Sequence, residues 1–309
     1  MAANILVFGS LNADLVFAVD RLPAPGETVI GPGYTVIPGG KGANQAVAAA
    51  GARVAVQMAG CVGADSFGDL LLRSLEGARV ATGLVHRIAA PTGCAAIGVD
   101  AAGANQIMVA GGANLEARAA DVADAMLTPE TTLVLQMEVQ AAQNWALIRR
   151  ASERGVRVVL NVAPAAPLPE DILPLIDVLV VNEGEAIAVA RGLDADIGDP
   201  AGCGRFLAGR TGGACVVTLG EAGSIGFSGK DAWRLGALPV TPVDTTAAGD
   251  GFVGWLAARL CVGDALPEAM HWAAVAAGLA CEAAGAQPSL PSLDAVACRR
   301  PDLAEAVRL

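Results

Sequence analysis

The chain has 309 residues, of which 54% are hydrophobic but only 4% aromatic, so a large core must be built from small and aliphatic side chains. The formal net charge of −11 disfavours nucleic acid and anionic membrane surfaces as partners, because both select clustered Lys and Arg. No apolar stretch reaches the roughly 18 to 20 residues that a membrane-spanning helix needs, and we see no signal peptide. The seven scattered cysteines indicate a reduced, cytoplasmic protein.

Apolar, β-branched segments alternate along the chain with helical patterns. Strands are predicted at 5–8, 54–58, 133–136, 156–160, 178–181 and 215–218. Helices are predicted at about 42–50, 65–76, 142–154, 183–191 and 200–210, and the chain after about 249 is expected to be mainly helical. Continuous apolar strands separated by helices are typical of a parallel sheet covered on both faces.

Two segments interrupt this alternation. Residues 13–37 carry Pro23, Pro25 and short β-like runs, and residues 92–110 alternate between apolar and small or polar side chains. Both are predicted to leave the main sheet as antiparallel excursions. We expect them to meet as a small β-sheet lid, inserted into a single α/β domain that spans residues 1–309.

Polar side chains follow two of the predicted strands. Asn12 and Asp14 come after the first strand, and Glu138 comes after the strand at 133–136. Ligands of open α/β sheets bind at the carboxyl ends of strands. The spacing of Asn12 and Asp14 fits a turn that presents both to a polyol, although a plain turn-forming pair explains it equally well. Glu138 alone reads as a solvated loop carboxylate.

A glycine-rich turn leads into the first predicted helix. Gly39 and Gly40 permit a tight turn and close backbone approach, and Asn44 offers both a donor and an acceptor to a hydroxyl-rich ligand. Lys41 suggests a P-loop, but that spacing is absent because Thr35 occupies the first glycine position and Gly42 follows the lysine. No dinucleotide-binding glycine pattern is present either.

Two further turns carry candidate residues. Asn182 and Glu185 open the helix at 183–191, where they could hold Mg²⁺ through water, although acids are also common in a first helical turn. Thr218 to Gly223 follows the strand at 215–218. Its glycines Gly220 and Gly223 could let a nucleotide lie against the backbone, while a plain strand-to-strand turn is also plausible.

The most informative segment runs from Asp244 to Gly254. The small residues Ala247, Ala248 and Gly249 precede Asp250 and an apolar helical pattern. The free N–H groups and the dipole of a helix start favour an anion. An acid beside such an anion hole is suited to accept a proton while a phosphoryl group is held nearby. The simpler alternative is a helix-capping Asp.

Together these segments resemble the PfkB carbohydrate kinase family from Asn4 to about Pro291. The most specific parts are 39–46 and 244–254, and segments 161–165, 182–185 and 285–289 are also similar. The resemblance implies the ribokinase-like fold, a three-layer α/β/α sandwich with a mostly parallel central sheet and a small β-sheet lid. Members of the family often dimerise through these lids, so a homodimer is expected.

The resemblance also implies roles for individual residues. Sugar-binding roles fall on Asn12, Asp14, Gly39, Gly40, Lys41, Asn44 and Glu138. Asp250 is implied as the general base, beside an anion hole at Ala247, Ala248 and Gly249. ATP contacts are implied for Asn182, Glu185, Thr218, Gly220, Gly223, Gly249 and Ala274. A potassium ion is implied near Asp244, Thr246, Ala280, Ala283, Gly285 and Ser289, and Mg²⁺ near Asn182 and Glu185 through water.

The implied activity is transfer of the ATP γ-phosphate to a sugar, first of all to the 5-hydroxyl of D-ribose. Deoxyribose, fructose, 2-keto-3-deoxygluconate and nucleosides are alternative acceptors within the family. A sugar-binding regulator without catalysis is a further alternative, but Asp250 and Gly249 are both retained. Two positions depart from the family pattern: Ala274 stands where a His can lie near adenine, and Trp255 stands where a smaller residue is usual.

Overall fold

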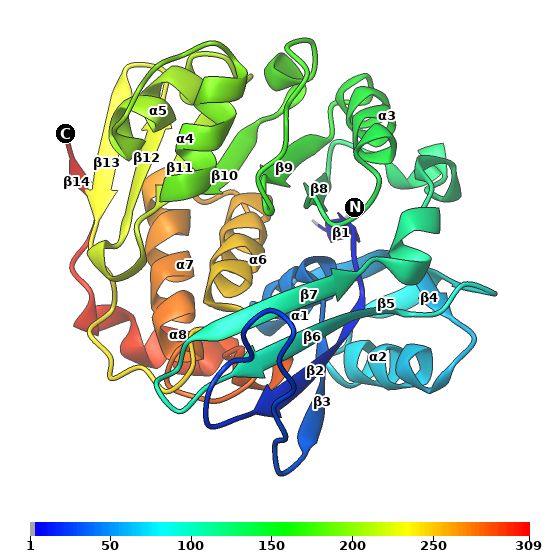
Figure 1. Ribbon diagram of the computed structural model, residues 1–309. Helices are drawn as coiled ribbons and strands as arrows, with labels where there is room; N and C mark the ends of the chain where they lie inside the picture. Colours follow the sequence, from blue (N-terminus) through cyan, green and yellow to red (C-terminus); the bar gives the residue numbers. More distant parts are fainter. Residues whose placement is uncertain (1–3) are drawn as a thin grey trace.

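The computed structural model describes residues 4–309, within which the longer of two sheets has ten strands in the order β14-β13-β12-β11-β10-β9-β8-β1-β4-β5 (Figure 1). Its strands are β1 (Asn4–Phe8), β4 (Ala55–Gly63), β5 (Ala81–Ile88), β8 (Thr131–Leu135), β9 (Arg157–Asn161), β10 (Val178–Asn182), β11 (Ala214–Thr218), β12 (Ser224–Ser228), β13 (Asp231–Leu235) and β14 (Val307–Arg308). The run from β11 to β5 is parallel, and β12, β13 and β14 extend it antiparallel at one edge.

Helices cover both faces of this sheet. They are α1 (Lys41–Gly51), α2 (Ser66–Gly77), α3 (Ala141–Ser152), α4 (Glu183–Gly192), α5 (Pro200–Ala208), α6 (Ala248–Cys261), α7 (Leu266–Ala280) and α8 (Leu293–Arg299). Alternate residues of β1 enter opposite cores, with Ile5 and Val7 facing α1 and α6 and with Leu6 and Phe8 facing α3. Two buried faces explain why the parallel strands are apolar throughout, and the α/β sandwich predicted from sequence is confirmed.

The two segments that interrupt the alternation pair into one small sheet. Its strands are β2 (Asn12–Ala18), β3 (Tyr34–Gly39), β6 (Gly93–Val99) and β7 (Asn105–Ala110), in the order β3-β2-β6-β7. The outer pairs are antiparallel as expected, but the central pair, β2 with β6, is parallel. The reason is that β2 continues from β1 and β6 follows β5, and these two strands leave the long sheet in the same direction.

Some expectations were wrong in detail. Asn12 and Asp14 lie in the extended strand β2, where residues two apart share a face, and not in a turn. Four strands were missed: β5, β12, β13 and β14. These are edge or near-edge strands with glycine, serine or charged residues, so they lack the apolar continuity of the buried parallel strands. None of the helices within residues 4–309 is both long and apolar enough to cross a membrane.

Helices α1 and α6 pack closely against each other on one face of the long sheet (Figure 1). Gly254 makes this approach possible, because a Cβ there would lie 2.5 Å from the Gln45 carbonyl oxygen and 2.6 Å from the Ala48 Cβ. Trp255 is fully buried beside this contact and stacks on Trp272 with ring centroids 6.0 Å apart. Trp255 therefore packs against α7, and its Nε1 lies 3.8 Å from a Cβ built on Gly51 at the end of α1.

Gly254→Ala is expected to destabilise the protein by about 1–3 kcal/mol, because the added methyl group must push α6 away from α1. Urea unfolding monitored by circular dichroism measures this change. Gly77→Ala is the matched control: it ends a helix with nothing within 4 Å of the added Cβ, so its effect should be neutral or mildly stabilising. Equal stability of the two variants would contradict the close packing of α1 on α6.

Candidate active site

The carboxylate of Asp250 lies in the first turn of α6, where it faces the first turns of α1. Asn44 donates a 3.0 Å hydrogen bond to its Oδ2, and Gln45 donates a 3.0 Å hydrogen bond to its Oδ1. Asp250 is only 7% exposed. Burial raises its pKa, while Lys41 and the two amide donors oppose that rise. The carboxylate is thus desolvated but held by three groups that favour its charged form.

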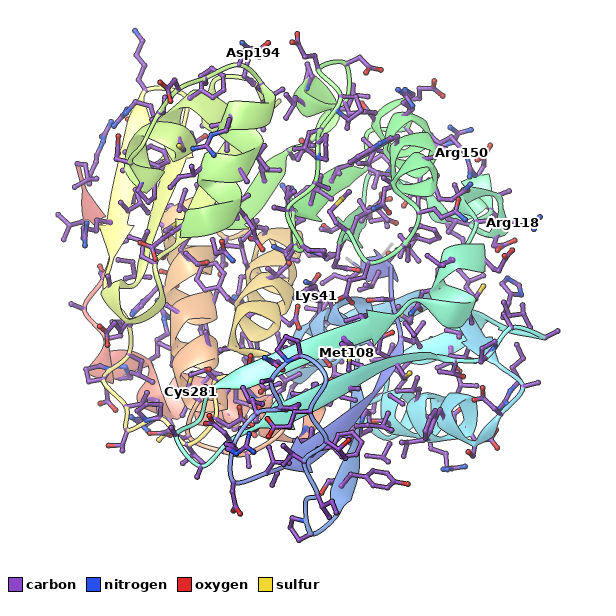
Figure 2. All side chains as sticks on the ribbon, viewed as in Figure 1. Lys41, Met108, Arg118, Arg150, Asp194 and Cys281 are labelled. Atoms are coloured by element: carbon purple, nitrogen blue, oxygen red, sulfur yellow. The ribbon has the colours of Figure 1, made fainter. Side chains whose placement is uncertain are left out.

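Lys41 opens α1 and lies beside the small sheet (Figure 2). The charges of four carboxylates act on it, and together they form an acidic cluster of Asp14, Glu138, Glu185 and Asp250. The negative charge of Asp250 is the main cause of the raised pKa of Lys41, with smaller contributions from Glu138, Glu185 and Asp14. One ammonium group therefore balances four carboxylates that come from four separate segments of the chain. Burial raises the pKa of Glu185 as well.

Asn12 and Asp14 share one face of β2, where the Asp14 carboxylate lies against the turn before α1 and the Asn12 side chain lies against Gly93 and Asn114. Gly39 is the register partner of Asn12, and a Cβ at Gly39 would overlap the Asp14 carboxylate. Gly40 has φ of 88°, and a Cβ there would lie 2.6 Å from the Asn12 backbone nitrogen. The two glycines are therefore required by the close approach of the turn to β2.

Burial raises the pKa of Asp14 to about 7, with further contributions from the charges of Glu138 and Asp250 and an opposing effect of Lys41. Glu138 is fixed by accepting a 2.6 Å hydrogen bond from the Ser10 hydroxyl and a 3.1 Å bond from the Lys41 N–H, both through Oε2. Its other oxygen remains available on the side of the acidic cluster.

The amino terminus of α6 carries the small residues singled out in the sequence. Ala247 adopts the left-handed conformation with φ of 59°, which is strained for a residue with a side chain. The Ala248 N–H makes a long 3.3 Å bond to the Thr245 carbonyl, and the Gly251 N–H bonds to the Ala247 carbonyl. Within residues 4–309, the N–H groups of Gly249 and Asp250 have no acceptor, and nothing lies within 4 Å of a Cβ built on Gly249.

A cavity of about 600 Å³ opens beside this helix start. Five residues expected to contact ATP line it: Thr218, Gly220, Gly223, Gly249 and Ala274. The turn from Thr218 to Gly223 joins two antiparallel strands, and it also forms part of the cavity lining. Apolar residues such as Leu238, Val240 and Phe252 form the rest of the wall, which suits a flat aromatic ring.

Asn182 and Glu185 form a reciprocal capping box at the start of α4. The Asn182 side chain accepts a 2.8 Å bond from the Glu185 N–H, and the Glu185 carboxylate accepts a 2.8 Å bond from the Asn182 N–H. These two residues therefore cap the start of a helix, as the simpler alternative predicted. One carboxylate oxygen of Glu185 stays outside this pair and can accept from water.

Asp244 joins the loop before α6 to the loop after α7. Its carboxylate accepts 2.9 Å bonds from the N–H groups of Thr246 and Gly285. Burial opposes ionisation, but these hydrogen bonds outweigh it and hold the pKa of Asp244 below its usual value. Further along the second loop, the buried Ser289 donates to the Ala286 carbonyl. Ala280 is the last residue of α7, and Ala283 lies in the loop that follows it.

Sequence reasoning missed several residues that fix this site. Asn114 holds Asn12 by donating a 2.7 Å bond to its Oδ1, and Ser10 holds Glu138. Gln136 and Asn161 contact the Gln45 side chain behind Asp250. Gln136 ends a predicted strand and could have been suspected from that position. Asn114 is 102 residues from Asn12, and no local signal connects them.

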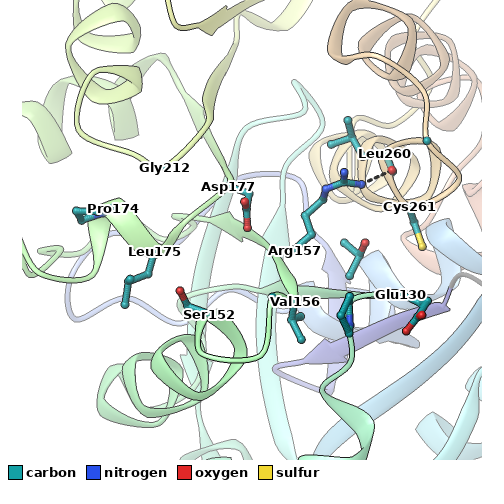
Figure 3. Close-up of a pocket in the computed structure, with 14 residues that line it drawn as sticks. Glu130, Ser152, Val156, Arg157, Pro174, Leu175, Asp177, Gly212, Leu260 and Cys261 are labelled. Carbon is teal, nitrogen blue, oxygen red and sulfur yellow. Dashed lines mark hydrogen bonds between the residues drawn. The ribbon is translucent and has the colours of Figure 1, made fainter.

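A second pocket, of about 540 Å³, lies at the amino-terminal ends of the central strands β9, β10 and β11, opposite to the ends that carry Asn12 and Glu138 (Figure 3). There the Arg157 guanidinium donates to the Leu260 carbonyl near the end of α6. No residue expected in the active site lines it. The chemistry-bearing groups instead gather at the carboxyl edge, where open α/β sheets bind ligands.

Known proteins share both the sequence pattern and this architecture. Residues 2–293 match the model of the pfkB family of carbohydrate kinases. The ribokinase of Schizosaccharomyces pombe is 35% identical, with 94% of this chain and 95% of that protein covered. A deoxyribokinase of Salmonella typhi is 33% identical, with 94% and 96% covered.

Two solved structures agree closely with the fold. The ribokinase of Thermotoga maritima matches with a TM-score of 0.89 at 31% identity, covering 96% of this chain and 99% of that one. The Arabidopsis thaliana ribokinase, solved with ribose and ATP, matches with a TM-score of 0.87 at 30% identity, covering 97% and 99%. The family match over nearly the whole length shows that this chain belongs to the pfkB family of carbohydrate kinases.

Proposed function

We propose that the protein is an ATP-dependent ribokinase, which transfers the γ-phosphate of ATP to the 5-hydroxyl of D-ribose. The observation that carries this proposal is the buried Asp250 carboxylate beside the unpaired N–H groups at the start of α6. A proton acceptor and an anion hole lie next to each other there, as in-line phosphoryl transfer requires. The similarity to ribokinases over nearly the full chain supports the choice of ribose.

In this proposal the sugar lies between β2 and the start of α1. The carboxylates of Asp14 and Glu138 accept hydrogen bonds from its secondary hydroxyls, and the Asn12 amide nitrogen donates to another. Lys41 and Asn44 border the same space from α1. Gly39 and Gly40 allow the backbone to approach the ring. Asp250 accepts the proton of the 5-hydroxyl as that oxygen attacks phosphorus, while the acidic surroundings keep the carboxylate basic enough to do so.

ATP is proposed to occupy the cavity beside α6, with adenine against its apolar wall and Ala274. Gly220 and Gly223 leave room for the nucleotide beside the turn. The N–H groups of Gly249 and Ala247 hold the transferring phosphoryl group, and Ala248 joins them by releasing its long bond to the Thr245 carbonyl. Preorganised donors of this kind stabilise charge that develops in the transition state, and removing one typically lowers turnover about 10²–10³-fold.

Two cations are proposed to assist. Asn182 and Glu185 fit a Mg²⁺ ion held through water, because their capping box leaves one carboxylate oxygen free toward the acidic cluster. When bound, Mg²⁺ neutralises charge on the ATP phosphates. Asp244, which joins two loops through Thr246 and Gly285, fits a potassium site completed by Ala280, Ala283 and Ser289. Potassium there would order the strained start of α6 without touching substrate.

The proposed assembly is a homodimer through the small sheets. Phe17, Tyr34 and Met108 are between 36% and 74% exposed, and the strand register places them on the face of that sheet opposite to Asp14. Figure 2 labels Met108 on the outer strand β7. Apolar side chains gathered in this way mark an interaction surface.

Met108→Glu should convert a dimer into single chains in sedimentation equilibrium. A wild-type mass of one chain at micromolar concentration would contradict the dimer.

Deoxyribose is the second acceptor to test, because a deoxyribokinase is nearly as similar as the ribokinases. In an ADP-release assay with ATP and Mg²⁺, turnover should be fastest with ribose, slower with deoxyribose, fructose and nucleosides, and higher in potassium than in sodium.

Asp250→Asn should still bind ribose in calorimetry while kcat falls at least about 10²-fold, because the proton acceptor is lost.

Three results of that assay would count against the proposal. Faster turnover with deoxyribose would replace the substrate, near-normal turnover of Asp250→Asn would remove the assigned base, and ribose binding without any ADP release would indicate a regulator.

The acidic cluster should also make the free protein sensitive to pH. An acid whose folded-state pKa is raised, such as Asp14 at about 7, binds more protons when folded, so stability is lost as pH rises from about 4 to 7. Asp14→Asn removes this penalty, so it should raise the melting temperature at pH 8 by about 2 °C or more and by much less at pH 5. The variant should also bind ribose more weakly. An equal change at both pH values would contradict the raised pKa.

A further inference from the structure

A chain of buried amides lies behind the Asp250 carboxylate and is used by none of the contacts proposed for sugar or ATP. Gln45 of α1 and Gln136, just after β8, are both 0% exposed, and Asn161, at the end of β9, is 7% exposed. Gln45 donates from Nε2 to both Asp250 and Asn161, each at 3.0 Å. Gln136 donates a 2.8 Å bond to Gln45 Oε1.

The direction of every hydrogen bond in this series of amides is fixed. Asn161 donates a 3.2 Å bond to the Val180 carbonyl, so its Oδ1 must face Gln45 as an acceptor. Both hydrogens of Gln45 Nε2 are then used, one on Asn161 and one on Asp250. A flipped Gln45 amide would set its oxygen against two acceptors and its nitrogen against the Gln136 donor. The amide therefore has a single orientation that presents a donor to Asp250.

Gln136, at the far end of this series of amides, is unfavourable for stability. Gln136 Oε1 is buried without a hydrogen-bond partner among residues 4–309. A Cβ at Gly9 would overlap this amide, so the glycine at the end of β1 makes room for it. An unsatisfied buried acceptor typically costs about 1–3 kcal/mol. Stability alone does not explain an amide here, whereas orienting Gln45 does.

We infer that Gln45 is a positioning residue, which Gln136 and Asn161 orient so that it holds the Asp250 carboxylate in its ionised, substrate-facing position. The inference rests on the proposed function, because Asp250 must act as the base. Gln45 does not reach substrate itself. Its donor favours the charged form of Asp250 against burial, and its rigidity limits rotation of the carboxylate.

The charged groups that face Asp250 come from four other places. Lys41 of α1 favours its ionised form, and Glu138, after β8, opposes it. Asp14 of β2 and Glu185 of α4 are also close enough to interact with its charge. All four remain in a variant of Gln45, so a change in the pH dependence of such a variant reports the lost amide donor.

The test compares Gln45→Met with the wild type. Methionine keeps the length of the side chain but cannot donate, so the acidic limb of the kcat–pH profile should move up by about one unit. On the acidic limb kcat should therefore fall by up to about tenfold, and on the alkaline plateau it should recover to within about threefold of the wild type, while ribose KM changes less. Gln136→Met should shift the limb in the same direction by a smaller amount, and it decides the question if Gln45→Met does not fold.

Gln143→Met is the matched control. The Gln143 side chain on α3 accepts a 2.9 Å hydrogen bond from the Ala119 N–H, but it lies outside the active site. This variant should keep the wild-type pH profile. A wild-type acidic limb in Gln45→Met, or a loss of kcat that is the same at every pH, would overturn the inference.

A measurement without catalysis separates this inference from the proposed function. Losing the Gln45 donor raises the pKa of folded Asp250, and a raised folded-state pKa makes an acid lose stability as pH rises. The melting-temperature deficit of Gln45→Met should therefore grow from pH 5 to pH 8, while that of Gln143→Met stays constant. If Asp250→Asn keeps turnover but this deficit grows, the base assignment alone fails. If Asp250→Asn is inactive and the deficit does not grow, the positioning role alone fails.

Discussion

The structure depends on one buried carboxylate held between two helices. Asp250 begins α6, and its two oxygens accept bonds from Asn44 and Gln45 of α1. Burial raises the pKa of Asp250, and the two amides and Lys41 oppose that rise by favouring its charged form. Gly254 lets α6 approach α1 closely enough for these bonds to form. The close packing of α6 on α1 is therefore also what places the Asp250 carboxylate on its hydrogen-bond donors.

Around this carboxylate, stability is given up where ligands are expected to bind. Burial and the charges of Glu138 and Asp250 raise the pKa of Asp14, and burial raises the pKa of Glu185. Ala247 is strained, and the Gly249 N–H has no acceptor within residues 4–309. Each of these features is unfavourable in the free protein. The Gly249 N–H would be satisfied by a phosphate oxygen, and the carboxylates would gain hydrogen bonds from sugar hydroxyls. Strain and unpaired groups concentrated at one edge of the sheet are typical of a preorganised active site.

Much of the fold could be predicted because parallel strands buried on both faces leave a continuous apolar signal, as at 133–136 and 178–181. Edge strands such as β13 and β14 lack that signal and were missed. In the site, glycine turns and strand-end acids carry local patterns, so Lys41, Asp250 and Asp14 could be singled out. Asn114 and Asn161 act through partners 102 and 116 residues away, and such pairings arise only once the sheet is assembled.

The most direct measurement is a crystal structure with D-ribose and a non-hydrolysable ATP analogue bound. The ribose 5-hydroxyl should lie about 2.6–3.2 Å from an Asp250 carboxylate oxygen, with the γ-phosphate on the Gly249 N–H and the 5-hydroxyl in line for attack. A sugar bound away from β2 and α1, or a γ-phosphate that leaves the start of α6 empty, would contradict the proposed active site.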